Sequence, residues 1–330
     1  MAGMEPLLTS AAVAYGFNIR HCRPARRTWR LETDRGVFAL KAAPPSATAS
    51  FLRRAETHLV ANGFTRLPGI VATRTGEPEL ILPDGERYIL RPWLPGVRPV
   101  LDLEHKRDVE RVGEALAEMH LASLGFPKAG EPRPDVPSWL STLEARREDL
   151  LLFRDTAADG GGFARLYRRA LPAALADCEA AMALLREAGY VELAREREKT
   201  GGLCHGDVAA NNMLVHGRHA YLLDFDRAAP DVFPYDLAML LWRALPPQGW
   251  RADLASALLD AYRRVRALAP AEQKTIAALL HWPQQFWRLG SQYFRERLDR
   301  SERFFRGRLW QWTQGAPARQ SFLADARRGL

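Results

Sequence analysis

Residues 204–212 read Cys-His-Gly-Asp-Val-Ala-Ala-Asn-Asn, and residues 222–226 read Leu-Leu-Asp-Phe-Asp. The two stretches contain three oxygen-bearing side chains in a fixed order: Asp207, then Asn212, then Asp224. Two apolar runs lie between Asn212 and Asp224, and a His-Gly-Arg-His segment separates them. This pattern predicts a β-hairpin with Gly in its turn. The hairpin would return Asp224 to the side at which Asn212 starts.

An Asp, an Asn and a second Asp, in this order along the chain, are the side chains that phosphoryl transfer needs. In that reaction the protein mainly positions an acceptor hydroxyl and neutralises the charge of a triphosphate through Mg²⁺. Mg²⁺ prefers carboxylate, amide and water oxygens, so Asn212 and Asp224 are the predicted metal ligands. Asp207 is the predicted catalytic residue, because it would orient the acceptor hydroxyl or accept its proton. ATP and Mg²⁺ are therefore the expected cofactors.

The motif His-Gly-Asp-x-x-x-x-Asn followed by Asp-Phe-Asp resembles the aminoglycoside phosphotransferase and choline kinase superfamily, which has a protein-kinase-like fold. That superfamily usually has Gly where protein kinases have Arg, as at Gly206. Within it the chain looks closest to the spore-coat kinase-like proteins. Three segments are the basis of this closer resemblance: Phe-Ala-Leu-Lys at 38–41, Leu-Ala-Glu-Met-His at 116–120 and Phe-Trp-Arg at 286–288.

The resemblance implies an α+β fold with two lobes. A small antiparallel β N-lobe that binds nucleotide is expected over residues 1–91. A larger, mainly helical C-lobe with the catalytic loop and the acceptor-binding helices is expected over 92–330. The acceptor would be the hydroxyl of a small molecule, such as a sugar, an amino alcohol or a related metabolite.

Residues 17–91 carry the pattern of the expected N-lobe. Three short strands, at 17–22, 28–33 and 37–42, fit an antiparallel meander. Lys41 ends the third strand, where a kinase-like fold places the lysine that holds the α- and β-phosphates. A helix is predicted from Ser46 to Asn62. On this helix Glu56 is the expected ion-pair partner of Lys41, with Glu77 and Glu79 as the alternative carboxylates.

The adenine-binding linker is expected at residues 89–93, after strands at 80–82 and 88–90. Arg-Pro-Trp-Leu-Pro-Gly at 91–96 breaks the β pattern there. Ile89 and Arg91 are the predicted nucleotide-binding positions, through backbone groups. The turn before Thr28 contains no glycine, so it is not a Gly-rich phosphate loop. Its Arg26 and Arg27 fit either phosphate contacts or, more simply, a solvated basic turn.

The remaining C-lobe pattern is helical. An amphipathic helix is predicted over 108–123, with His120 as a buried structural residue. The segment 132–162, with three prolines in its first part and three glycines at its end, is expected to be an insertion with a loop at each end. One or two helices are expected within 164–197, and another helix opens at Pro234.

Three polar residues around the motif have expected supporting roles. The resemblance implies that Asp236 braces the backbone of the catalytic loop. His205 is expected to pack inward and to hydrogen-bond backbone near Asp224, rather than to bind a metal. For Asp226, a solvated position and a second metal-binding position both remain open.

Residues 282–312 interleave aromatic side chains with arginines. This composition fits binding of single-stranded nucleic acid. It also fits one long amphipathic helix whose aromatic stripe docks on the C-lobe. We favour the packed helix, so nucleic acid is not an expected partner. The excess of Arg over Asp and Glu in this region argues against cationic acceptors such as aminoglycosides.

Composition and charge limit the remaining possibilities. The chain has 330 residues, of which 47% are hydrophobic and 26% charged, so it is an ordinary globular protein with room for two lobes. No apolar run approaches the roughly 18 residues of a membrane helix, and the first residues lack a signal-peptide pattern. A cytoplasmic location is expected, or a spore coat reached without a signal peptide. Three scattered cysteines predict neither a disulfide framework nor a zinc site.

The sequence leaves two alternatives to a small-molecule kinase. A spore-coat or assembly protein could keep the fold for binding coat-protein partners, with little or no catalysis. Retention of Asp207, Asn212 and Asp224 argues against it, because packing alone requires none of them. A protein kinase is disfavoured because no Ala-Pro-Glu segment follows Asp224. The choice between ATP and GTP is not determined by the sequence.

Overall fold

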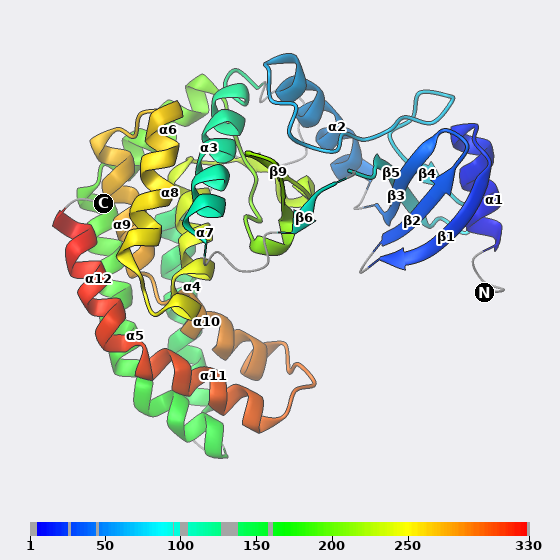
Figure 1. Cartoon of the computed structure of the whole chain (residues 1–330). Helices are drawn as coiled ribbons and strands as arrows, with labels where there is room; N and C mark the ends of the chain where they lie inside the picture. Colours follow the sequence, from blue (N-terminus) through cyan, green and yellow to red (C-terminus); the bar gives the residue numbers. More distant parts are fainter. Residues whose placement is uncertain are drawn as a thin grey trace.

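The structure is a computed structural model of the whole chain. It describes residues 5–25, 28–43, 46–94, 96–99, 105–126, 138–157 and 161–328. Figure 1 shows a small body with the β-sheet and α1 at one end and a larger helical body at the other. This arrangement confirms the predicted α+β, two-lobed fold. In the smaller body and its junction lie α1 (Glu5–Tyr15), β1 (Ile19–Ala25), β2 (Thr28–Thr33), β3 (Gly36–Ala42), α2 (Ser46–Ala61), β4 (Leu80–Ile81) and β5 (Arg87–Pro92).

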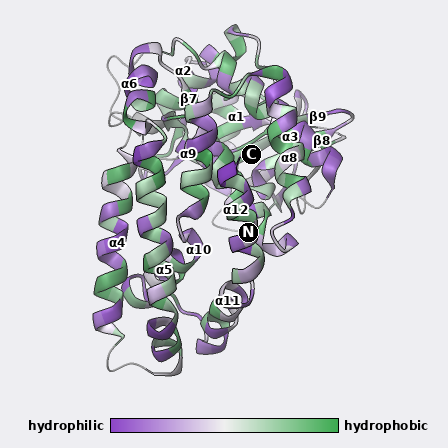
Figure 2. Ribbon diagram, turned by 90° about the vertical axis from the view of Figure 1, so that its left-hand side faces the viewer, coloured by the Kyte–Doolittle hydropathy of each residue, from purple (hydrophilic) through white to green (hydrophobic). Residues whose placement is uncertain are grey.

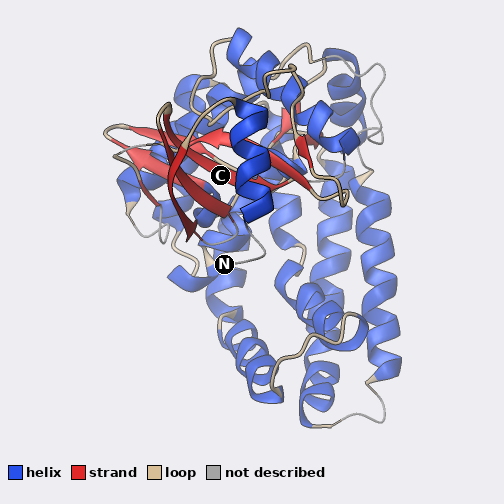
Figure 3. Ribbon diagram, turned by 90° about the vertical axis from the view of Figure 1, so that its right-hand side faces the viewer, coloured by secondary structure: helices blue, strands red, loops and turns tan. Residues whose placement is uncertain are grey.

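The smaller body is built on one antiparallel sheet with the strand order β1-β2-β3-β5-β4. The predicted meander of three strands is therefore confirmed. Helix α1, which the sequence analysis did not predict, lies in front of this sheet in the view of Figure 3. Its buried residues Leu7, Ala11 and Tyr15 recur every four positions and so share one helix face. They pack with Leu31 and Leu90 in a core separate from that of the helical body.

Helix α2 joins the two bodies rather than covering the sheet alone. Its buried side chains Phe51, Leu52 and Ala55 belong to the same core cluster as α3 of the helical body. Figure 1 shows α2 at the junction of the two bodies. Movement of α2 would therefore disturb the larger core.

The larger body consists mostly of helices, with three short strand pairs near the junction. Its elements are β6 (Arg98–Pro99), α3 (Lys106–Ala122), α4 (Trp139–Thr156), α5 (Gly162–Glu187), α6 (Tyr190–Thr200), β7 (Leu203–Cys204), β8 (Met213–His216), β9 (His219–Leu222), β10 (Ala229–Pro230), α7 (Pro234–Ala244), α8 (Ala252–Val265), α9 (Pro270–His281), α10 (Gln284–Gly290), α11 (Glu302–Gln314) and α12 (Ala316–Arg328).

Close helix packing organises this body. Helix α3 approaches α8 so closely at Gly113 that a Cβ atom there would lie 2.5 Å from the carbonyl oxygen of Leu258. Helices α4 and α5 run side by side (Figure 2). Helix α4 occupies most of the described part of the expected insertion at 132–162, and the proline-rich start of that segment lies outside the described residues.

The expected single long helix at 282–312 is wrong. The chain forms α10, then a π-helical turn at Ser291–Arg295, then a loop before α11. The break follows Gly290, where a Cβ atom would lie 2.3 Å from the hydroxyl of Tyr167, so the chain is pressed against α5. The predicted packing of the aromatic residues is confirmed at Phe286, which stacks on Tyr167 with ring centroids 4.2 Å apart. Within the described ranges, no helix has the length and apolar character needed to cross a membrane.

Candidate active site

The catalytic loop follows β7 and leads into the predicted hairpin, which is confirmed. Strands β8 and β9 pair antiparallel, with Met213 opposite Leu222. The backbone N–H of Leu223 donates to the carbonyl oxygen of Asn212 at 2.8 Å. Asp224 therefore returns beside Asn212, as the spacing predicted.

Asp236, at the start of α7, holds the backbone of the catalytic loop. Its fully buried carboxylate accepts hydrogen bonds from the backbone N–H of His205 at 2.6 Å and of Gly206 at 3.0 Å. Its third partner is the buried His120 ring, at 3.1 Å. Burial would raise the pKa of Asp236, but the hydrogen bonds and nearby histidines bring it below its usual value. The predicted bracing role of Asp236 and the structural role of His120 are both confirmed.

His205 also has the predicted position. Its Nε2 lies 2.8 Å from the carbonyl oxygen of Leu223, the residue before Asp224. The neighbouring group His120, Cys204 and Asp236 has atoms close enough to hold a metal ion. Each of the three already has a protein partner, including the Sγ of Cys204, which donates to a backbone carbonyl oxygen. We therefore assign this buried group a structural role.

Gly206 has a geometry that only glycine accommodates. Its φ is +74°, and a Cβ atom there would lie 2.2 Å from the carbonyl oxygen of Arg227. A side chain at this position would therefore clash with backbone as well as adopt a left-handed conformation. This close approach gives a physical reason for Gly before Asp207.

The carboxylate of Asp207 is held at both oxygen atoms. Asn212 Nδ2 donates to Oδ2 at 3.1 Å and to the backbone oxygen of Asp207 at 2.9 Å. Arg243 Nη2 donates to Oδ1 at 2.8 Å, and its Nη1 donates to the carbonyl oxygen of Val208 at 2.8 Å. The sequence motif does not predict Arg243. A signal was present, because Arg243 follows Asp236 by two helical turns and so shares its helix face.

Lys41 lies between the two carboxylates of the Asp-Phe-Asp segment. Its Nζ is 2.6 Å from Oδ1 of Asp224 and 2.6 Å from Oδ2 of Asp226. Burial acts to raise the pKa of both carboxyl groups. At Asp224 the hydrogen bond and charge of Lys41 outweigh burial, so the pKa is lowered. At Asp226 burial prevails, and the pKa is raised. Asp224 also has a φ of 65°, an unusual backbone conformation for a residue other than glycine. Such strained residues cluster at functional sites.

The expected ion pair between Lys41 and Glu56 is wrong. Glu56 is buried, with Oε1 2.7 Å from Arg91 Nη1 and Oε2 accepting from the backbone N–H of Ile70 at 2.9 Å. In the sheet, Lys41 pairs with Ile89 and Ala39 with Arg91, so Lys41 and Arg91 lie on the same face. The guanidinium of Arg91 reaches Glu56, whereas Lys41 reaches the Asp-Phe-Asp carboxylates.

The remaining predicted positions of the smaller body need one further correction. Residues 89–92 belong to β5 and not to a linker, because Pro92 still pairs with Phe38 and Trp93 N–H donates to the carbonyl oxygen of Val37. The alternative carboxylate Glu79 pairs with Arg87 at 2.7 Å. Arg26 and Arg27 lie outside the described residues.

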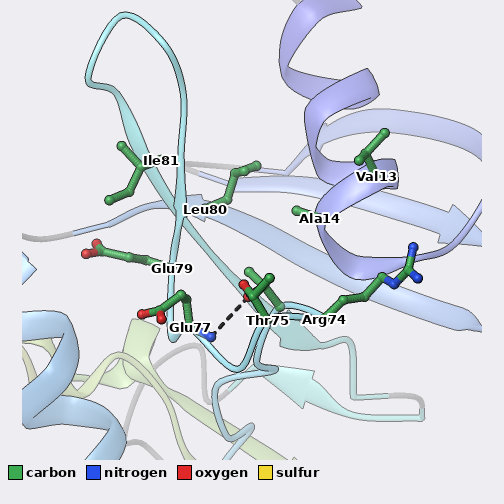
Figure 4. A pocket seen from close by; sticks show the side chains of 9 residues that line it. Val13, Ala14, Arg74, Thr75, Glu77, Glu79, Leu80 and Ile81 are labelled. Atoms are coloured by element: carbon green, nitrogen blue, oxygen red, sulfur yellow. Dashed lines mark hydrogen bonds between the residues drawn. The ribbon is translucent and has the colours of Figure 1, made fainter.

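Of two cavities in the structure, one lies away from the loop that carries Asp207 and the other borders it. The larger, about 670 Å³, lies between α1 and residues 73–81, and Figure 4 shows Glu77 and Glu79 pointing to the same side of it. Glu77 and Glu79 were the alternative carboxylates for Lys41; the residues predicted for catalysis, metal binding and nucleotide binding do not line this cavity. The smaller, about 350 Å³, borders the catalytic loop. Its lining residues include Trp139, Gly206, Asp226, Asp231 and Tyr235.

The fold and this cluster together define the class of the protein, a phosphotransferase of protein-kinase-like fold. Residues 25–268 match the model of the phosphotransferase enzyme family, and the chain belongs to that family. The predicted superfamily is thus confirmed, as is the predicted enzyme class, a phosphotransferase with an alcohol group as acceptor.

Curated relatives of the chain include two homoserine kinases. The homoserine kinase of Rhodopseudomonas palustris strain HaA2 is 30% identical over 257 residues, which cover 76% of this chain and 70% of the relative. That of Nitrobacter winogradskyi is 32% identical over 228 residues, which cover 67% of this chain and 61% of the relative. These relatives give no support to the expected closeness to spore-coat proteins.

Solved structures of low sequence identity share the fold. An aminoglycoside phosphotransferase from Alicyclobacillus acidocaldarius superposes with a TM-score of 0.85 at 23% identity, covering 96% of this chain and 93% of that one. A spectinomycin phosphotransferase in complex with ADP and spectinomycin gives a TM-score of 0.65 at 13% identity, covering 93% of each chain.

Proposed function

We propose that the protein transfers the γ-phosphate of ATP to the hydroxyl group of a small amino acid or related alcohol, with homoserine as the first acceptor to test. The observation that carries this proposal is the fixed carboxylate of Asp207, held on one oxygen by Asn212 and on the other by Arg243. A carboxylate held in this way is oriented before an acceptor arrives. The names of the homoserine kinase relatives support the choice of acceptor.

The residues beside Asp207 fit a magnesium-bound nucleotide. The ammonium group of Lys41 lies between Asp224 and Asp226, so these carboxylates already gather around a cation. Asn212 and Asp224 supply the oxygen atoms that would hold Mg²⁺. Bound there, Mg²⁺ would neutralise charge on the β- and γ-phosphates.

Lys41 has a second role in this proposal. With nucleotide bound, its ammonium would move from the two carboxylates to the α- and β-phosphates. The nucleotide would lie between residues 1–91 and 92–330, with backbone near Ile89 and Arg91 beside the adenine. Glu56 would act indirectly, because it holds Arg91 on β5 and not Lys41.

The test is homoserine-dependent formation of ADP by the native chain and by Asp207→Asn. The variant should lose about 10²- to 10⁴-fold in kcat, while its Kd for Mg²⁺-ATP stays within about twofold of the native value. Normal turnover of Asp207→Asn would remove Asp207 from the catalytic role. Turnover of another alcohol but not of homoserine would contradict only the choice of acceptor.

A further inference from the structure

We propose that Arg146 binds a carboxylate group of the acceptor. The proposal rests on the proposed function and specifies the acceptor as a hydroxy acid, which includes hydroxy amino acids. Arg146 lies on α4, whose first residue Trp139 lines the cavity that Gly206 borders. The proposal therefore concerns the acceptor side of the site and not the nucleotide side.

The guanidinium of Arg146 is held by aromatic rings. Its Cζ lies 4.4 Å from the ring centroid of Trp287 and 5.5 Å from that of Trp139. One N–H group donates to Oε1 of Gln284 at 3.1 Å. The rings and Gln284 fix the position of the cation without neutralising its charge.

Arg146 has no carboxylate partner within the ranges that the structure describes. The nearby Asp149 is used by two other groups, Trp287 Nε1 at 3.0 Å and Arg295 Nη1 at 3.1 Å. A guanidinium has five N–H donors, and the hydrogen bond to Gln284 uses one of them. Burial lowers the pKa of Arg146, yet an arginine stays charged in proteins. A half-buried cation with free donors is a binding group for a planar anion.

The aromatic wall connects Arg146 to the catalytic loop. Trp139 stacks on Tyr235 with ring centroids 4.2 Å apart. Both rings line the cavity of about 350 Å³ that Gly206 and Asp226 border. Asp207 follows the lining residue Gly206 in the chain, and Arg146 lies against the lining residue Trp139. A short hydroxy acid with its hydroxyl at Asp207 would direct its carboxylate along this wall toward Arg146.

The carboxyl group in the same wall does not favour a cationic acceptor. Asp231 is buried, and its oxygens accept from Trp139 Nε1 at 3.1 and 3.2 Å and from the backbone N–H of Val232 at 2.7 Å. Burial raises the pKa of Asp231 to about 8, and these hydrogen bonds only partly offset it. Asp231 is thus a weak counter-charge at neutral pH to the two cations near this wall, Arg146 against Trp139 and Arg227 in the lining of the cavity beside Asp226.

The experiment compares alcohols that differ only in a carboxylate. The pairs are homoserine with 3-aminopropanol, and 4-hydroxybutyrate with 1-propanol. Since a hydrogen-bonded charge contributes about 1.5–3 kcal/mol, the native enzyme should prefer the carboxylated member by about 10- to 100-fold in kcat/KM. Arg146→Met should lose most of this preference through a raised KM, and Arg146→Lys should recover part of it. Arg154→Met, on the same helix and paired with its neighbour Asp155 among the described residues, is the matched control and should keep the preference.

Two results would overturn the proposal: equal use of both members of each pair by the native enzyme, or an unchanged preference in Arg146→Met. An unchanged melting temperature and Mg²⁺-ATP affinity would show that Arg146→Met is folded. If no alcohol is phosphorylated, binding of 4-hydroxybutyrate is followed by tryptophan fluorescence. Binding that Arg146→Met loses would support the carboxylate site and contradict only the proposed kinase activity, whereas no binding to the native chain would overturn the site.

Discussion

Arg243 shows how one side chain outside the motif can hold the carboxylate of Asp207, the proposed catalytic residue. Its guanidinium spans Oδ1 of Asp207 and the carbonyl oxygen of Val208, and so ties the catalytic loop to α7. Asn212 holds the other carboxylate oxygen. The carboxylate of Asp207 therefore cannot rotate without breaking a hydrogen bond at either end.

We expect Arg243→Met to lower kcat about 10- to 100-fold, because a hydrogen bond to a charged group contributes about 1.5–3 kcal/mol. The KM for ATP should change little, since Arg243 acts on the acceptor side. Steady-state kinetics with homoserine measures both values. Arg264→Met, which removes an exposed arginine on α8 paired with Glu114, is the control and should leave kcat unchanged. An unaltered kcat in Arg243→Met would show that the contact does not position Asp207.

The motif residues could be predicted because their positions depend on local sequence. Asp207, Asn212 and Asp224 are separated only by one loop and one hairpin, so spacing alone places them together. The pairing of Glu56 could not be predicted in the same way. Lys41 and Arg91 lie on the same face of adjacent strands, so either could have reached Glu56 on α2. Only three-dimensional packing decides that Arg91 does so.

At the scale of elements, the contact of α3 with α8 depends on the missing side chain of Gly113. Gly to Ala in a helix normally stabilises by about 0.5–1 kcal/mol. At Gly113, however, the new Cβ would lie 2.5 Å from backbone, so Gly113→Ala should destabilise by about 1–3 kcal/mol. Gly307 in α11 has no neighbouring atom within 4 Å of a new Cβ, so Gly307→Ala is the matched control and should stabilise. Urea unfolding measures the free energy of unfolding of both variants. Equal changes in Gly113→Ala and Gly307→Ala would contradict the close approach of α3 to α8.

The contact of α9 with α12 should depend on pH. His281 is buried and accepts a hydrogen bond from Arg327 Nε at 3.0 Å. Burial, and then the charge of Arg327, lowers its pKa from 6.5 to about 4. As pH falls, His281 is protonated in the unfolded chain before it is protonated in the folded chain. The contribution of neutral His281 to the free energy of unfolding is therefore complete above pH 6.5 and is lost as pH falls toward 4.

The variant His281→Gln cannot titrate at this position. Its free energy of unfolding should therefore fall less than that of the native chain between pH 6.5 and 4. Urea unfolding at several pH values measures the difference in slope. Parallel curves for His281→Gln and the native chain would contradict the account of His281.

Boundaries of elements were predicted less well where tertiary contacts decide them. The aromatic and basic pattern of 282–312 is compatible with one helix, but packing of Gly290 against Tyr167 precedes a break that no local signal marks. Helix α1 did leave a signal, the four-residue spacing of Leu7, Ala11 and Tyr15.

At the scale of the whole molecule, the site is assembled from both bodies. Lys41 comes from the sheet, while Asp224 and Asp226 come from the helical body. Helix α2 spans the junction (Figure 1), and its Glu56 holds Arg91 of β5. Binding of nucleotide at this junction should therefore stabilise the whole chain and not one body alone.

Thermal unfolding with Mg²⁺-ATP is the most direct test of this central claim. Ligand at about 100 times Kd adds roughly 2.7 kcal/mol to the free energy of unfolding, which for a chain of this length raises Tm by about 4 °C. We predict this rise for the native chain, its loss when EDTA removes Mg²⁺, and its loss in Asp224→Asn. A native chain whose Tm does not move under saturating Mg²⁺-ATP, or an equal rise in Asp224→Asn, would contradict the assignment of Lys41 and Asp224 to a nucleotide site.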